Sequence, residues 1–194
     1  MIYPIIAYGD PILRKKAIDL SADYENLQQL INDMYETMRS SSGIGLAAPQ
    51  IGKSIRLFIV DSKYVLDNYR DDEEYEFRNE AGITETFINA KIISKGGDKW
   101  NYNEGCLSIP KIREDVLRED EVVIEYYNAQ FEKQEKIFDG LTGRVIQHEY
   151  DHLEGILFVD HLKPLKKRLL KKKLENISKG IVHVDYRMKF PLKK

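Results

Sequence analysis

His148-Glu149-Tyr150-Asp151-His152 places two imidazoles four residues apart, with a carboxylate directly after the first. On a helix, such positions lie on one face about one turn apart, so both rings can reach the same metal ion. Glu149 projects at an adjacent angle, close to any water that this metal holds. The stretch therefore matches the H-E-x-x-H pattern of metal-assisted hydrolysis. Because so short a pattern also occurs by chance, the flanking residues have to show whether it marks a metal site.

The flanking residues predict a helix around the motif. Asp139 is a suitable N-cap, and Gly155 is a suitable residue just after the helix end. The alternative is an amphipathic helix with two surface histidines, which is disfavoured because two of only four histidines have ligand spacing. The i, i+3, i+4, i+7 pattern of one helix face is occupied by Val145, His148, Glu149 and His152.

A catalytic metal usually has three protein ligands and one open position, so a third ligand is needed. One protease group uses a histidine six residues after the motif, where this chain has Phe158. Another uses a glutamate from a later helix, for which Glu175 is the candidate. The third candidate is Cys106, the only cysteine, in Glu104-Gly105-Cys106-Leu107-Ser108. Its alternative is an inert buried thiol. A lone cysteine cannot form an internal disulfide, which fits a reducing cytosol.

A third segment, Gly43-Ile44-Gly45-Leu46-Ala47-Ala48-Pro49-Gln50, follows a run of serines. Its glycines let the backbone approach another group closely or adopt positive φ, and its alanines allow tight packing. The Gln50 side-chain amide can donate a hydrogen bond. Taken alone, the segment indicates a turn packed on a core.

Together the three segments resemble the peptide deformylase family. That family is marked by G-Φ-G-Φ-A-A-x-Q, E-G-C-L-S and Q-H-E-x-D-H segments in this order, found here at Gly43–Gln50, Glu104–Ser108 and Gln147–His152. The opening Asp10-Pro11-Ile12-Leu13-Arg14 is also similar, and the resemblance spans roughly residues 3 to 162. It implies a metal-dependent hydrolase that removes the formyl group from N-formylmethionine at the N-terminus of new polypeptides and releases formate.

The resemblance also implies the roles of individual residues. Glu149 takes a proton from the attacking water and gives one to the departing amine. Gln50 and the backbone N–H of Leu107 stabilise the oxyanion. One divalent metal ion is expected, with ferrous iron favoured in the cell and zinc, nickel or cobalt able to substitute; the ligand types alone favour zinc. The implied metal ligands are Cys106, His148 and His152.

The substrate is expected to lie along four of these family positions. Gly45, beside Ile44, would hold the peptide chain in an extended form, and Gly105 also belongs to the substrate site. Arg113 matches a family arginine near the substrate and is a candidate to orient Glu104, the alternative being a surface arginine. Apolar side chains at Ile44, Leu141 and Val145 either form a methionine pocket or belong to the ordinary core.

Two other functions remain as alternatives. A zinc peptidase acting on another class of substrate would need Glu175 or another carboxylate as a ligand and would leave Cys106 unused. An inactive relative would only bind peptide N-termini or the ribosome. The presence of Glu149, Gln50 and Cys106 argues against it, because a binding module needs no general base.

Length and composition set wider limits. A chain of 194 residues, with 42% hydrophobic and 32% charged residues, fits one soluble globular domain, so we expect a single catalytic domain over residues 1–194. The net charge of −2 argues against a general polyanion binder, and DNA is not an expected partner. No apolar run approaches the ~20 residues of a membrane span, and no signal peptide is indicated. We expect a cytoplasmic protein without a membrane partner.

The remaining pattern predicts an α+β protein with antiparallel sheets packed around the metal-bearing helix. Tyr24–Arg39 has the apolar face of an amphipathic helix, and Ser54–Asp61 and Phe87–Ser94 have strand composition. Glu119–Tyr127 and Glu132–Phe138 indicate a hairpin.

Two segments depart from the family pattern. Residues 64–85 are acidic and rich in tyrosine, and we expect an exposed, mobile surface insertion. Residues 163–194 contain a basic helix, Lys163–Ser178, and a tail, Gly180–Phe190, that alternates like a strand. The basic residues of 163–173 predict docking on ribosomal RNA. The alternative is a solvated face with Leu165, Leu169 and Leu170 packed on the core.

Overall fold

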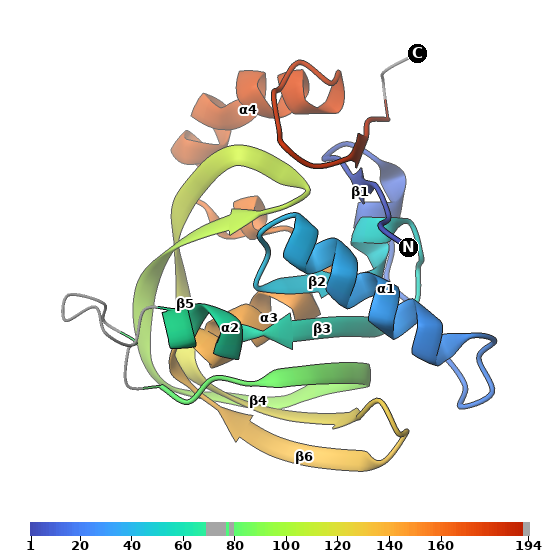
Figure 1. The fold of residues 1–194 in the computed structure, drawn as a ribbon. Coiled ribbons are helices and arrows are strands. Elements are labelled where there is room, and N and C mark those ends of the chain that lie inside the picture. Colours follow the sequence, from blue (N-terminus) through green and yellow to red (C-terminus); the bar gives the residue numbers. More distant parts are fainter. Residues whose placement is uncertain (69–76, 78–79, 192–194) are drawn as a thin grey trace.

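The computed structural model describes residues 1–68, 77 and 80–191 of the chain (Figure 1). Its main element is an antiparallel sheet with the strand order β2-β3-β4-β5-β6. The α+β class and the hairpin predicted at its edge are confirmed. The strands are β2 (Gly45–Ala47), β3 (Leu57–Asp61), β4 (Thr84–Cys106), β5 (Ile109–Tyr127) and β6 (Lys133–Phe138).

β4 and β5 form a hairpin that is much longer than the strands predicted from the sequence. Register shifts interrupt its pairing at four places, and each such bulge bends the strands and increases their twist. The hairpin therefore curves out of the sheet toward the top of the molecule (Figure 1). Its tip is a two-residue turn, because Cys106 pairs directly with Ile109. The chain thus carries its only thiol at the end of a long curved arm.

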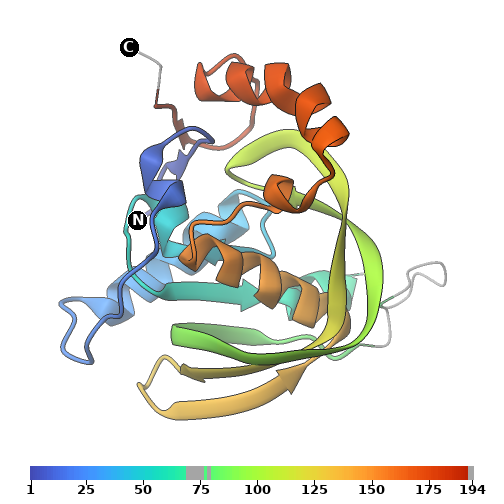
Figure 2. The same ribbon diagram turned by 180° about the vertical axis from the view of Figure 1, so that it is seen from behind.

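The helix α3 (Gly140–Leu153) contains the H-E-x-x-H motif and contacts β2, β3 and β5. Figure 2 shows it lying across one face of the sheet, as predicted. Both predicted ends are confirmed, since Asp139 is the N-cap residue and Gly155 adopts a φ of +72°. The Asp139 side chain makes no capping hydrogen bond, however. The Leu141 N–H instead donates to Glu80 Oε1 at 3.1 Å.

The described parts of the predicted 64–85 insertion are not simply an exposed loop. Residues Ser62–Asn68 form the helix α2, and the Ser62 hydroxyl lies 2.8 Å from that of Thr142 at the start of α3. Phe77 is buried and packs on Trp100. Apolar burial outweighs the acidic composition at these points. The rest of the predicted loop, residues 69–76 and 78–79, lies outside the described residues.

The helix α1 (Leu27–Ser40) covers the other face of β2 and β3 (Figure 1). It begins three residues later than predicted because Asn26 adopts a left-handed conformation, with φ of 57°. Its apolar side is buried as the sequence pattern predicts. The buried apolar residues are Leu30, Ile31, Met34 and Met38.

The basic helix is α4 (Pro164–Ser178), as predicted. The tail behind it forms only a short strand, β7 (Met188–Lys189), which pairs in parallel with β1 (Ile5–Ile6). None of the helices in the described part of the chain is long and apolar enough to cross a membrane. The described part of the chain also contains three short 3-10 helices: η1 (Pro11–Arg14), η2 (Ala48–Ile51) and η3 (Phe158–His161).

Candidate active site

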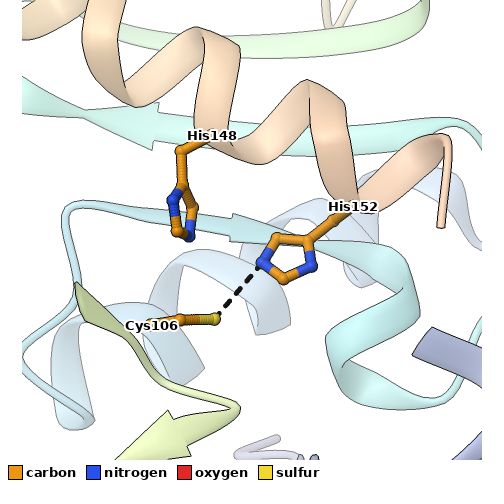
Figure 3. A group of neighbouring side chains, drawn as sticks. All are labelled: Cys106, His148 and His152. Atoms are coloured by element: carbon orange, nitrogen blue, oxygen red, sulfur yellow. Dashed lines mark hydrogen bonds between the residues drawn. The ribbon is translucent and has the colours of Figure 1, made fainter. Parts of the chain in front are cut away.

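Three predicted metal ligands meet between α3 and the tip of the β4–β5 hairpin (Figure 3). Cys106 Sγ lies 3.3 Å from His152 Nε2, and the ligand atoms of Cys106, His148 and His152 all lie within 4.8 Å of one another. Within residues 1–68, 77 and 80–191, this is the one such cluster of three or more histidine, cysteine or acidic side chains. The positions that hold the third ligand in the two protease groups, Phe158 and Glu175 here, are not part of it. Phe158 stacks beside His148, and Glu175 lies on α4.

The three side chains fit one divalent metal ion. A tetrahedral site with sulfur at about 2.3 Å and nitrogen at about 2.0–2.1 Å separates its donor atoms by about 3.5 Å, close to the Cys106–His152 distance. The donors are a thiol and two imidazoles, which suit transition metals rather than calcium or magnesium. Three protein donors also leave the open position that a catalytic site requires.

Buried charges fix the orientation of His148. Its Nδ1 lies 2.9 Å from Glu104 Oε2, which leaves Nε2 as the metal-facing nitrogen. The Glu104 carboxylate also accepts hydrogen bonds from Arg118 Nε at 2.7 Å and from Arg144 Nη1 at 3.1 Å. Although burial raises the pKa of Glu104, the bonds from His148 and Arg118 outweigh it and lower that pKa strongly.

Arg113 does not orient Glu104, contrary to the prediction. Its guanidinium is directed to Asn103, with Nε 3.0 Å from Asn103 Oδ1 and Nη2 bound to the Asn103 carbonyl. In a strand, successive residues face opposite sides, and Arg113 and Arg118 differ by an odd number of positions, so they face opposite sides. Arg118 therefore reaches the buried side where Glu104 lies, while Arg113 lines the cavity.

The same ion-pair network continues to Asp151, one turn further along α3. Arg118 Nη1 donates to Asp151 Oδ2 at 2.7 Å, and His161 Nε2 lies 2.7 Å from that same oxygen. The network therefore connects α3, β4, β5 and η3 next to His148. A buried charge needs such partners, because desolvation alone would favour its neutral form.

Glu149 has a different environment. It is only 4% exposed, and its Oε2 has no hydrogen-bond partner among the residues the structure describes. Burial raises the pKa of this carboxyl to about 7, although the neighbouring imidazoles act in the opposite direction. A Cβ added at Gly45 would lie 2.6 Å from Glu149 Oε1, so the glycine allows this close approach. The carboxylate is thus placed to exchange protons rather than to balance a charge.

The cysteine and Gln50 form the opposite side of the cluster. Burial alone would raise the pKa of the Cys106 thiol, but the imidazoles of His152 and His148 lower it to about 5 and favour the thiolate that binds metals. Gln50 Oε1 accepts a hydrogen bond from the Ala47 N–H at 2.8 Å. Its Nε2 therefore faces the cluster, 3.5 Å from Cys106 Sγ and 3.4 Å from Ser108 Oγ.

A cavity of about 530 Å³ opens onto the cluster. It is large enough for an extended peptide end and bordered by β2, by the β4–β5 hairpin and by the start of α3. His152 is not one of its lining residues. Of the residues proposed from the sequence, the cavity is lined by Ile44, Gly45, Gln50, Gly105, Cys106, Leu107, Arg113, Leu141, Val145, His148 and Glu149.

Sequence reasoning did not find Arg118, Arg144, Asp151, His161 and Tyr186, which support this site. One signal was available. Arg118 and Arg144 are charges within otherwise apolar strand and helix patterns, and a charge on a buried face indicates a paired network. Nothing in the sequence connects Tyr186 to the site, because that contact depends on how the tail folds back.

Comparisons with known proteins agree with this geometry. The model of the polypeptide deformylase family matches residues 2–168. A peptide deformylase of Christiangramia forsetii is 52% identical over 98% of this chain and 97% of its own length. One from Flavobacterium johnsoniae is 51% identical over 100% of this chain and 98% of its own.

Solved structures show the same likeness. A peptide deformylase structure from Legionella pneumophila has a TM-score of 0.75 and 36% identity, covering 91% of this chain and 95% of that one. The family match, the close relatives and the shared fold have one explanation: the chain belongs to the peptide deformylase family, metal-dependent hydrolases that remove the formyl group from N-formylmethionine at the start of newly made polypeptides.

Proposed function

We propose that deformylation takes place at the Cys106–His148–His152 cluster, with Glu149 as the general base. The observation that carries this proposal is the buried Glu149 carboxylate beside the three ligand atoms, with one oxygen unpaired among the described residues. A divalent cation held there supplies Lewis acidity, which lowers the pKa of water and polarises the formyl carbonyl. The whole chain, residues 1–194, is proposed to act as one catalytic domain.

Glu149 moves the proton. Oε2 accepts it from the water that attacks the formyl carbon, and the carboxyl then gives it to the departing amine nitrogen as the C–N bond breaks. Formate and a free N-terminal methionine are the products. The network at Glu104 supports this work at a distance, because it keeps His148 in one tautomer and one orientation.

Gln50 and Leu107 are proposed to stabilise the oxyanion formed by that attack. Gln50 Nε2 faces the cluster because its carbonyl oxygen is held by the Ala47 N–H. Leu107 follows the cysteine directly and lines the same cavity. Donors fixed before the reaction act on the charge that develops in the transition state, and one such donor is typically worth ~3–4 kcal/mol of barrier.

The substrate chain is proposed to run along β2. This strand is at the edge of the sheet, so its outer side is not paired by the sheet and can bind an extended peptide. Ile44 and Gly45 line the cavity beside β2, and Gly105 and Arg113 of the β4–β5 hairpin line it as well. The apolar side chains of Leu141 and Val145 face the same cavity, which supports a methionine pocket rather than a core role alone.

The test is an assay of formate release from a formyl-Met-Ala peptide by the metal-loaded protein. Cys106→Ser is the discriminating variant, and we expect it to alter or abolish metal binding and to lose activity. A zinc peptidase with another third ligand would keep its metal in this variant and would cleave internal peptide bonds instead. An inactive relative would bind the peptide and release no formate.

We propose ferrous iron as the metal used in the cell. The donor set itself suits zinc, so the proposal rests on the family, many of whose members work best with iron. Protein made without oxygen should then be more active and lose activity in air, because both iron and thiolate can be oxidised. Nickel or cobalt should give stable activity. Equal, air-stable activity in the zinc form would refute iron and leave the site assignment intact.

The basic surface of α4 is proposed to bind ribosomal RNA in the cytoplasm, near the emerging nascent chain. Leu170 is buried, but Leu165 and Leu169 are exposed, so the alternative in which all three pack on the core is wrong. The residues that form this surface are Lys163, Lys166, Lys167, Arg168, Lys171, Lys172 and Lys173.

Charge reversal tests this surface. The triple variant K171E/K172E/K173E should weaken ribosome binding and its salt dependence, yet leave hydrolysis of a free formyl peptide unchanged. The matched control reverses three exposed lysines elsewhere, Lys15, Lys91 and Lys95. Equal ribosome affinity of the wild type and the α4 variant at low salt would refute the proposal.

A further inference from the structure

The turn at the tip of the β4–β5 hairpin holds two functional groups close together. Cys106 pairs with Ile109, so Leu107 and Ser108 are the two central residues of the turn. Cys106 carries the thiol, and the next residue provides the Leu107 N–H proposed as an oxyanion donor. In such a turn the central carbonyl groups have no partner in the strand ladder, so other groups have to bind them.

Both carbonyl groups are bound by donors from distant parts of the sequence. The Tyr186 hydroxyl donates to the Leu107 carbonyl at 2.8 Å, and the Tyr8 N–H donates to the Ser108 carbonyl at 2.8 Å. Two of the three peptide units of the turn, Leu107–Ser108 and Ser108–Ile109, are therefore held by donors from outside it.

The two donor segments are also joined to each other. Tyr8 follows β1 and Tyr186 precedes β7, and these two strands pair in parallel (Figure 1). The Ile5 N–H donates to the Arg187 carbonyl at 2.8 Å, and the Ala7 N–H donates to the Lys189 carbonyl at 2.9 Å. The small β1–β7 sheet is thus a brace for the turn rather than an isolated pairing at the surface.

The C-terminal part of this brace lies beside the substrate cavity. Val184, Asp185 and Tyr186 line it, and the Tyr186 ring packs with the buried cluster around β2, β3 and α1. These residues lie beyond residue 168, where the family match ends. The wall of the cavity is therefore completed by a segment that the family pattern does not include.

We propose that Tyr186 is a positioning residue, through which the C-terminal tail holds the Cys106–Ser108 turn and directs the Leu107 N–H toward the reacting formyl oxygen. The inference rests on the proposed function of Leu107. A donor that acts on developing charge affects the transition state more than substrate binding. Loss of the Tyr186 hydroxyl should therefore lower kcat and leave KM nearly unchanged.

The test compares two substitutions in the full-length, metal-loaded protein. Tyr186→Phe removes only the hydroxyl group, and we expect kcat for a formyl-Met-Ala peptide to fall about three- to tenfold, as loss of one neutral hydrogen bond implies. Metal content and melting temperature should stay close to those of the wild type. The matched control is Tyr35→Phe, which removes a hydroxyl 3.3 Å from Thr86 Oγ1 on another face and should keep the wild-type kcat.

A second measurement separates this inference from the proposed function. In zinc-loaded protein, the NMR signal of the Leu107 amide should shift in Tyr186→Phe and not in Tyr35→Phe. If the wild type releases no formate, the proposed function fails, while this signal still reports on the turn. An unchanged kcat in Tyr186→Phe, an equal loss in Tyr35→Phe, or an unmoved Leu107 signal would overturn the inference.

Discussion

Glu104 and Glu149 are equally buried, yet they lie in opposite environments a few residues from the same cluster. Glu104 is 3% exposed and is surrounded by His148, Arg118 and Arg144, which lower its pKa. Glu149 is 4% exposed, and burial raises its pKa to about 7. One carboxylate is fixed as an anion and orients a ligand. The other has no hydrogen-bond partner on Oε2 among the described residues and can exchange a proton. The neighbouring groups, rather than the extent of burial, therefore distinguish the two carboxylates.

The largest effect is expected on turnover, from substitution of Glu149. Glu149→Gln keeps the size of the side chain but cannot accept a proton, so turnover should fall by two to four orders of magnitude, about what general acid–base catalysis contributes. Metal content and melting temperature should be retained, since no charged partner is left behind. Both are measurable on one preparation, by formate release and by thermal unfolding. A variant that keeps most of its activity would show that the base is another residue.

Substitution of Glu104, the carboxylate with charged partners, should lower the free energy of unfolding. Glu104→Gln leaves Arg144 without its buried anion and Arg118 with only Asp151, and breaking such a network by removing one partner costs about 3–5 kcal/mol. Metal affinity should also fall about tenfold to a hundredfold, because His148 loses its orienting carboxylate. Denaturant unfolding and metal titration measure the two effects. If Glu104→Gln unfolds like Glu149→Gln, the two carboxylates do not differ as described.

Gln50 lies between the two environments, with Oε1 bound by the backbone and Nε2 facing the cluster. Gln50→Ala should lower kcat about a hundredfold, the lower end for one oxyanion donor, with metal content little changed. Steady-state kinetics separate the possible outcomes, because a donor used only in the transition state affects kcat and not mainly KM. A pure KM effect would assign Gln50 to substrate binding.

The smallest effect is expected on stability, from substitution of a third carboxylate, Glu80. Glu80 accepts the Leu141 N–H at the start of α3, whereas the Asp139 side chain makes no capping bond. Glu80→Ala should therefore cost about 1 kcal/mol of stability, as the loss of a cap does, and Asp139→Ala should cost less. Thermal unfolding of both variants decides the matter. The reverse order would place the cap at Asp139.

The difference between the two carboxylates also marks the limit of the sequence. The H-E-x-x-H spacing predicted α3 and the position of His148 and His152 in one cluster, because helical periodicity is local. Cys106 and Gln50 came from the family resemblance, since ligand spacing alone left three candidates. Arg113 was the predicted partner of Glu104, but Arg118 makes that ion pair. The choice depends on which side of a long curved strand each arginine faces, and no local pattern predicts this. Glu80 and Tyr186 act across contacts that no local pattern contains.

The β1–β7 pairing has a consequence for folding kinetics. Its two strands lie far apart in the sequence, and contacts of such high sequence separation form slowly because closing the long intervening loop costs conformational entropy. Because Tyr8 and Tyr186 lie beside this pairing, we expect the turn that carries Cys106 to be braced late in folding. On refolding, helical circular dichroism should therefore recover before formate release does, so that the active site matures later than the fold around it.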